Sequence, residues 1–126
     1  MPDQAAPEKK LIRKFEEEIP YTQPCGPNCT FGTLLPCRQT GDLNIGRVRM
    51  QGPTWNEVGA HTDWHQVYVM LQGKGRMLIG EEEVPVEAPC LIQIPHNTDH
   101  AMRVDDGEYV EYLYVNHMLK YAAQHG

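Results

Sequence analysis

Two stretches of sequence decide the fold: GAHTDWHQVYVMLQGKG at residues 59–75 and VEAPCLIQIPHNTDHAMRV at residues 86–104. Each contains short runs of β-branched, aromatic and aliphatic residues, with histidines at the edge of a run. Runs of four to eight such residues bounded by Gly, Pro, Asn or Asp are typical of β-strands. The first stretch is therefore predicted to contain one strand and the second to contain two.

The same pattern of short apolar runs continues on either side of these stretches. Strand-sized apolar runs fall at residues 44–50, 66–72, 76–79, 82–86, 91–94, 100–104 and 109–115. Several short strands at close spacing predict an all-β sandwich or barrel. We assign residues 43–116 to this barrel and residues 117–126 to a C-terminal tail.

The N-terminal third has a different character. Residues 7–18 show the only helical pattern, with Leu11, Ile12 and Phe15 on one face, and Pro20 ends it. Residues 21–41 are rich in Pro, Gly, Thr and Asn, which predicts a loop with one short strand near residues 31–35. Residues 1–42 are thus expected to form a short helical arm and a loop packed on the barrel.

One predicted strand is apolar on both faces. In the run 66–72, Val67, Val69 and Leu71 share one face and Tyr68 and Met70 share the other. A strand with one exposed face alternates apolar and polar residues instead. The pattern therefore predicts that a second sheet or subunit covers the outer face, which favours a homodimer.

Charge and composition narrow the possible partners and the compartment. The formal net charge is −6, whereas nucleic acids and anionic membranes select basic patches. No apolar run approaches the roughly 20 residues that span a bilayer, and no signal-peptide pattern opens the sequence. We expect a cytoplasmic protein that binds neither nucleic acid nor membrane, with its four cysteines as thiols.

The positions of the histidines point to a metal site inside the barrel. Side-chain alternation places His100 with Met102, and Gln66 with Tyr68, on faces that look into the interior. His61 lies in a turn-like segment before Gln66, from which it can fold over the same point. Neutral imidazole is the commonest ligand of this kind of metal site. The residues thus predict one divalent metal bound by His61, Gln66 and His100.

Residues 59–75 resemble the first conserved motif of the cupin superfamily: a histidine pair, a Glu or Gln, and an apolar strand ending on Gly. Residues 86–104 resemble the second motif, Pro-x-Gly-x-x-His, which here reads Pro95-His96-Asn97-Thr98-Asp99-His100. The resemblance covers residues 43–115 and implies a double-stranded β-helix, the jelly-roll barrel of the cupins. It also implies a hairpin through Gly73, Gly75 and Gly80 between the motifs.

The first motif departs from the family pattern. One histidine of the usual pair is missing, because Gly59 and Asp63 flank His61 at the two-residue spacing. Three alternatives remain: His65 supplies the lost ligand, Asp63 supplies it, or the site has three protein ligands. Asn97 replaces the glycine of the second motif, a mild change because Asn tolerates left-handed backbone.

Three further groups carry weaker signals. Cys25, Cys29 and Cys37 have a spacing that a structural zinc site tolerates, but ordinary thiols are favoured, with a redox pair as a further alternative. Arg47 and Arg49 alternate on one strand and would clamp a carboxylate if they faced inward; an outward orientation is favoured. Tyr68 shares the interior with Gln66, which makes it the candidate catalytic acid or base.

Two functions fit these residues. The first is an enzyme that acts on a small organic molecule by dioxygenase-, lyase- or isomerase-type chemistry, with His61, His65, Gln66 and His100 as candidate ligands of Fe, Mn, Ni, Zn or Cu. The second is a non-catalytic module that binds a metal or a small molecule. The enzyme is preferred, although the fold alone does not decide between them.

Overall fold

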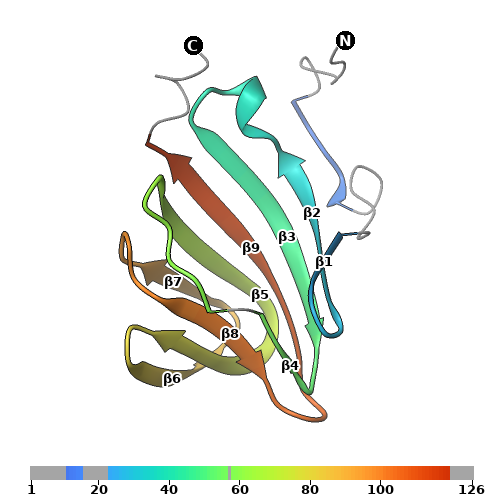
Figure 1. Ribbon diagram of the computed structural model, residues 1–126. Coiled ribbons are helices and arrows are strands. Elements are labelled where there is room, and N and C mark those ends of the chain that lie inside the picture. Colours follow the sequence, from blue (N-terminus) through green and yellow to red (C-terminus); the bar gives the residue numbers. More distant parts are fainter. Residues whose placement is uncertain (1–10, 16–22, 57, 120–126) are drawn as a thin grey trace.

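The computed structural model describes residues 11–15, 23–56 and 58–119, which form an antiparallel β-structure (Figure 1). In chain order the elements are β1 (Gln23–Gly26), β2 (Cys29–Leu35), the 3-10 turn η1 (Cys37–Gln39), β3 (Leu43–Gln51), β4 (Thr54–Trp55), β5 (Trp64–Ile79), β6 (Glu82–Glu87), β7 (Cys90–Ile94), β8 (His100–Val104) and β9 (Tyr109–Met118). The predicted all-β class is confirmed. No helix in the described part of the chain has the length and apolar character needed to cross a membrane.

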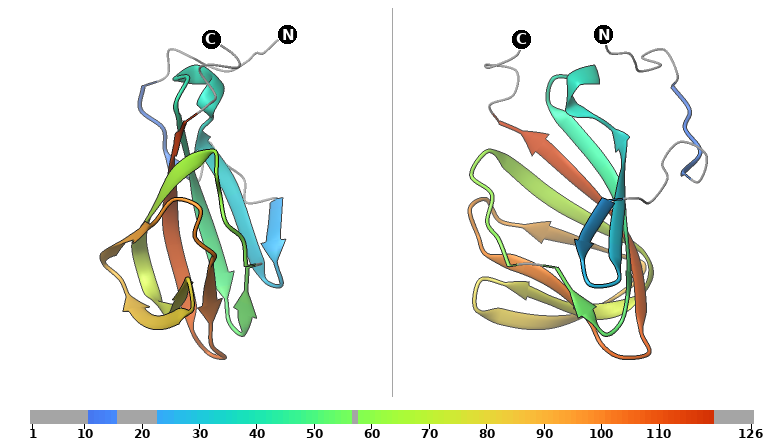
Figure 2. Two further views of the ribbon diagram at one scale, coloured as in Figure 1. Left: turned by 60° about the vertical axis from the view of Figure 1, so that its left-hand side comes forward. Right: turned by 45° about the vertical axis from the view of Figure 1, so that its right-hand side comes forward.

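The strands form two sheets that share β5. The larger sheet has the order β1-β2-β3-β9-β5-β7, and the smaller one has the order β6-β5-β8-β4. Every neighbouring pair is antiparallel. Figure 2 shows β5 running out of the larger sheet and curving into the smaller one, so that the two sheets close around a common interior. This is the predicted jelly-roll barrel.

The curve in β5 corrects one expectation. Two strands, residues 66–72 and 76–79, were predicted, with a hairpin that includes Gly73; the structure has one strand of 16 residues and places the turn at residues 80–81. The register of β5 against β9 shifts between Met70 and Gln72. Gly73 follows at φ +85°, and a Cβ there would lie 1.6 Å from the Tyr109 carbonyl oxygen. The glycine therefore bends the strand instead of ending it.

Methionines dominate the interior between the sheets. Met50, Met70, Met77 and Met102 are at most 1% exposed, and they pack with Val104, Val110 and Tyr112. Flexible thioether side chains fill an irregular space between two curved sheets well. The side chains predicted to face inward on β5 and β8 are all in or beside this core.

The outer face of the larger sheet is also apolar. Val67 pairs with Val115 and Val69 pairs with Leu113, and these four side chains are half-buried. Leu91 on β7 is 65% exposed beside them. This matches the two-sided apolar pattern seen in the sequence, while the homodimer inferred from that pattern stays a prediction.

The sheet begins earlier than expected. The short strand predicted near residues 31–35 is observed as β2, which pairs with β3 in the larger sheet. β1 lies in a stretch predicted as loop and pairs with β2. Most of the helical arm predicted at residues 7–18 lies outside the described residues, and Leu11 to Lys14 are not helical. The Arg13 guanidinium instead donates hydrogen bonds to the Leu34 carbonyl oxygen (2.7 Å) and to the Gln39 side-chain oxygen (2.6 Å), which joins this segment to β2 and η1.

The expectation of four thiols was wrong for Cys29, which is disulfide-bonded in the structure. Cys37 and Cys90 are free. Burial, together with Asp42, raises the pKa of the Cys37 thiol. A disulfide-bonded Cys29 has no thiolate to give to a metal, so this state does not fit the zinc alternative.

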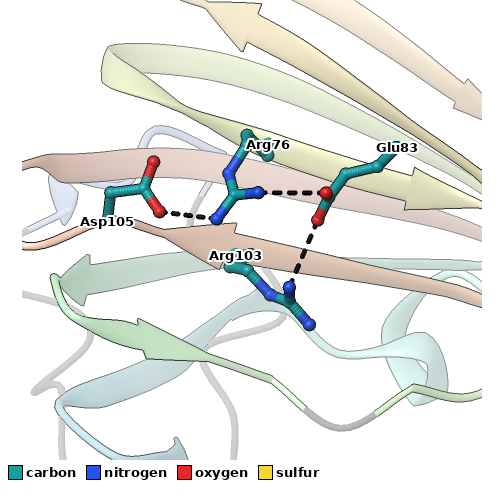
Figure 3. A network of polar contacts seen from close by, with 4 residues as sticks. All are labelled: Arg76, Glu83, Arg103 and Asp105. Atoms are coloured by element: carbon teal, nitrogen blue, oxygen red, sulfur yellow. Dashed lines mark hydrogen bonds and ion pairs between the residues drawn. The ribbon is translucent and has the colours of Figure 1, made fainter.

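A network of ion pairs covers the outer face of the smaller sheet (Figure 3). Arg76 on β5 donates hydrogen bonds to Glu83 (3.0 Å) and to Asp105 (2.7 Å), and Arg103 on β8 lies 3.4 Å from the second Glu83 oxygen. All four side chains are at least one-third exposed. Salt and water screen such pairs, so they add little to stability and mainly keep this face soluble.

We expect Met102→Ala to lower the free energy of unfolding by about 2–5 kcal/mol, because truncation of a fully buried side chain leaves a cavity between the sheets. Urea denaturation measures the change. The control is Leu91→Ala on the exposed outer face, for which a change of about 0.5 kcal/mol or less is expected. Equal effects of the two substitutions would contradict the assignment of the core.

Candidate functional site

A pocket of about 310 Å³ opens from the barrel interior. Four strands and the segments before β5 contribute its lining, which we call the barrel pocket: Phe31, Asn44, Val48, Asn56, His61, Trp64, Gln66, Tyr68, Tyr112, Tyr114 and Asn116. The inner faces of β3, β5 and β9 supply most of these side chains by simple alternation. The pocket is therefore a direct product of the register of three neighbouring strands.

Gln66, which lines this pocket, has a side-chain acceptor that is not used. Its side-chain Nε2 donates a hydrogen bond of 2.8 Å to Oδ1 of Asn116, its register partner on β9. That contact fixes which way the amide points. Gln66 Oε1 is left buried with no hydrogen-bond partner. A buried acceptor without a partner is costly, and such an atom in a native structure calls for a ligand or an ion.

His61 and His100 come together through backbone pairing. The Gly59 and His100 backbones exchange two hydrogen bonds (3.2 and 2.9 Å), which tie the segment before β5 to the start of β8. The His61 carbonyl oxygen also accepts from the Asn97 backbone N–H at 2.9 Å. The two imidazole rings lie 4.9 Å apart between centroids. Asn97 has φ +57°, the left-handed conformation expected where it replaces the motif glycine.

Both imidazoles are held in a form that can bind a cation. His100 Nδ1 lies 3.0 Å from the Thr98 carbonyl oxygen. Because a carbonyl only accepts, Nδ1 carries the hydrogen, so Nε2 is the nitrogen that has the lone pair in the neutral ring. Burial, with a smaller contribution from the nearby His100, lowers the pKa of His61. His61 is therefore more often neutral at pH 7 than an ordinary histidine.

The donor set fits a divalent metal. Among the described residues no group of three or more His, Cys, Asp or Glu side chains is placed to hold an ion. The set here is different: two neutral imidazoles and one amide oxygen. Metal–nitrogen bonds of about 2.0–2.1 Å place two imidazole centres roughly 5 Å apart on one ion, close to the separation of His61 and His100. The orphaned Gln66 oxygen supplies the third donor.

His65 and Asp63, the two alternatives for a further ligand, are not brought to this group. His65 has an exposed side chain on the opposite face of β5, where its ring lies 5.2 Å from His96 and 6.3 Å from His117. Asp63 is exposed as well. Strict alternation from Gln66 predicts this placement of His65, because adjacent residues of a strand face opposite sides.

Trp64 contributes a second unpartnered atom. Its indole stacks on the His61 imidazole, with ring centroids 4.4 Å apart and planes inclined by 24°. Trp64 Nε1 is buried without a hydrogen-bond acceptor. Buried tryptophans usually find a partner for this N–H. Two residues that line the pocket, Gln66 and Trp64, thus each carry one buried polar atom without a hydrogen-bond partner.

A directed chain of hydrogen bonds orients the hydroxyl of Tyr68. The Met102 backbone N–H donates to Asn56 Oδ1 (2.7 Å), so the Asn56 amide nitrogen must point to the Tyr112 hydroxyl, 3.1 Å away. The Tyr112 hydroxyl in turn bonds Tyr68. Since the Tyr112 oxygen accepts from Asn56, its hydrogen is available for the Tyr68 oxygen. The hydrogen of Tyr68 is not used in this chain of hydrogen bonds.

The orientation of Arg47 is decided by the structure. It pairs with Glu111 on the outer face of the larger sheet, where its guanidinium also lies 4.7 Å from the centroid of the Phe15 ring. The favoured outward orientation of Arg47 is confirmed, so it does not clamp a ligand in the barrel.

Asn56 and Asn116 are pocket residues that the sequence reading missed. Alternation along β9 from Tyr112 would have found Asn116; Asn56, outside any predicted strand, gave no signal.

We expect the free energy of unfolding to fall between about pH 10 and pH 12, and to fall less steeply in Tyr68→Phe. Burial raises the pKa of Tyr68 to about 12, against a smaller opposing effect of its hydrogen bond with Tyr112. In the unfolded chain a tyrosine ionises near its ordinary pKa of about 10. Over this pH range the unfolded state therefore binds fewer protons than the folded state and becomes more stable relative to it. Urea denaturation at a series of pH values tests this; parallel curves for the two proteins would refute it.

Comparisons with known proteins support the fold. The sequence matches no family model and no curated protein. The structure is similar to a predicted oxalate decarboxylase from Thermotoga maritima (TM-score 0.74, 16% identity, 86% of this chain and 100% of that chain). It is also similar to the polyketide cyclase RemF from Streptomyces resistomycificus (TM-score 0.73, 14% identity, 85% and 79%).

A third similar structure is a cupin-2 domain from Rhodospirillum rubrum, with a TM-score of 0.66 and 16% identity. The match covers 74% of this chain and 62% of that one. At these identities the likeness concerns the fold. Taken with the two histidine motifs and their meeting in the barrel, it establishes that this protein has the fold of the cupin superfamily.

Proposed function

We propose that this protein is a metal-dependent cupin enzyme that acts on a small organic molecule by dioxygenase-, lyase- or isomerase-type chemistry. The observation that carries the proposal is the buried, unpartnered Oε1 of Gln66, a residue that lines the barrel pocket together with His61. His100, the second imidazole, is adjacent to His61. Tyr68 lines the same pocket and offers a proton.

His61, Gln66 and His100 are the residues that would hold the metal. A set of two imidazoles and one amide oxygen suits Fe, Mn, Ni, Zn or Cu. When bound, such an ion polarises a substrate oxygen, or activates dioxygen if it is iron. All three ligands are neutral, so none offsets the charge of the ion, which favours electron-rich oxygen donors in the substrate.

The other pocket residues have separate tasks in this proposal. Tyr68 supplies a proton from its hydroxyl, held in place by the Tyr112–Asn56 chain. Trp64 and Phe31 provide apolar surface that excludes water from the bound molecule. Asn116 fixes the Gln66 amide, so it is a positioning residue. Similarity to a polyketide cyclase and to a predicted oxalate decarboxylase is consistent with a small-molecule enzyme.

The alternative is a non-catalytic module that binds a metal or small molecule. One observation favours it: Tyr68 and Tyr112 are hydrogen-bonded to each other and stack with ring centroids 4.4 Å apart. A tyrosine whose oxygen already accepts a hydrogen bond and whose ring is stacked is better suited to line a pocket than to transfer a proton. The two functions differ in what removal of the Tyr68 hydroxyl does.

We expect purified protein to bind about one equivalent of Fe, Mn, Ni, Zn or Cu, and both His61→Ala and His100→Ala to lose it, because each removes one of three donors. His65→Ala is the matched control: it removes an imidazole four residues from His61 that faces outward, and should keep the metal. Elemental analysis after dialysis measures the stoichiometry. Loss of the metal in His65→Ala, or no uptake of any of these ions by the unaltered protein, would overturn the proposal.

We expect Tyr68→Phe to lower turnover by about 10²–10⁴-fold while the metal content stays unchanged, since general acid–base catalysis contributes this much. Oxygen uptake by the iron or copper form, and lyase and isomerase screens of the other forms, identify the reaction to be measured. Unchanged turnover in Tyr68→Phe would remove Tyr68 from the mechanism. A metal-loaded protein that is inactive in all these screens would support the binding module.

A further inference from the structure

The outer face of the larger sheet presents an apolar surface that continues from strand to strand. Val67 and Val69 on β5 point outward beside Val115 and Leu113 on β9, because the alternate positions of both strands line the barrel pocket. Leu91 extends this surface onto β7 and is exposed there. A contiguous exposed apolar surface on a soluble protein marks an interaction site.

Two exposed aliphatic side chains form a ridge beside this face. Leu11 is 90% exposed and Ile12 is 82% exposed, in the segment that Arg13 attaches to β2 and η1. The segment and the sheet form a groove of about 390 Å³, lined by Leu11, Arg13, Phe15, Leu34, Leu35, Ile45 and Leu113. Leu113 belongs to the groove and to the apolar face. The ridge, the groove and the four side chains on β5 and β9 are therefore one continuous surface, which we call the outer apolar surface.

The charges on this face allow two copies of the acidic chain to meet. In the larger sheet, the outward positions of β3, β9, β5 and β7 include one acidic residue, Glu111, and it is paired with Arg47. A group of carboxylates lies instead on the smaller sheet and on the turn before β9: Glu82, Glu83, Glu87, Asp105, Asp106 and Glu108. Facing like charges oppose association, so the outer apolar surface is the face on which two copies repel each other least.

The size of the sheet suits a stable dimer. At about 4.8 Å between strands, β2, β3, β9, β5 and β7 span about 24 Å, and residues 65–71 of β5 extend about 23 Å. Two such faces in contact bury roughly 1,100 Å², which exceeds the approximately 1,000 Å² expected of a specific interface. In a two-fold dimer both copies use the same surface, so the ridge of each copy contacts the other copy.

We propose that a second copy of this chain docks on the outer apolar surface and forms a two-fold dimer, in which Leu11 and Ile12 of each copy pack against the other. Val69 and Leu113 lie at the centre of the interface. Leu91 is on the edge strand β7 and belongs to the rim, where truncation of a side chain costs little. The interface uses none of the residues that line the barrel pocket, so the dimer is independent of the metal and of the reaction.

The test is the mass of the full chain in solution, measured by analytical ultracentrifugation over a range of micromolar concentrations. We expect the unaltered protein to have twice the chain mass of 14.4 kDa. Val69→Glu buries an unpaired charge at the centre of the interface and should raise the dissociation constant of the dimer by about 100-fold or more. Val84→Glu is the matched control and should leave the dimer intact, because Val84 is 42% exposed on β6 of the smaller sheet.

Circular dichroism checks that each variant is folded. The double variant Leu11→Ser/Ile12→Ser keeps the test decisive if Val69→Glu is not, because both side chains are exposed and lie outside the core. It should raise the dissociation constant by about tenfold or more, through the loss of apolar contact. The inference is overturned by a monomeric unaltered protein, by a folded Val69→Glu or double variant that dimerises as tightly as the unaltered protein, or by equal weakening in Val84→Glu.

Discussion

The bend in β5 is the constraint on which the rest of the structure depends. Its first half pairs with β7 and β9 in the larger sheet, and its second half pairs with β6 and β8 in the smaller sheet. Gly73 makes this possible because the β9 backbone approaches it too closely for any side chain. Through the bend, one strand carries Gln66 and Tyr68 into the pocket and Met77 into the core between the sheets.

The candidate site depends less on its charges than on hydrogen bonds that fix neutral groups. Asn116 turns the Gln66 amide, the Thr98 carbonyl oxygen selects the tautomer of His100, and Asn56 sets the direction of the tyrosine pair. Each of these contacts fixes which atom of the group keeps a lone pair or a hydrogen. A site built from such groups offers lone pairs to a cation.

Sequence reasoning succeeded where a local pattern dictates the answer. Alternation on β5 and β8 placed Gln66, Tyr68 and His100 inward, and the strand predicted at residues 100–104 is β8 as observed. It failed where contacts between distant chain segments determine which residues form a strand. The merging of two predicted strands into β5 depends on β9, and β1, in a stretch predicted as loop, depends on β2. A loop-like composition does not prevent a strand when an open sheet edge is available to pair with it.

The sequence by itself determined the all-β class, the two cupin-like motifs and which strand residues share a face, because side-chain alternation has a period of two in any strand. Only the tertiary structure decided which histidines meet. His65 is adjacent to Gln66 in the sequence and His61 is five residues away, yet His61 lines the pocket, next to the Gly59–His100 backbone pairing, and His65 is exposed on the outer face. Strand register and long-range hydrogen bonds, which no local pattern encodes, select the site from its candidates.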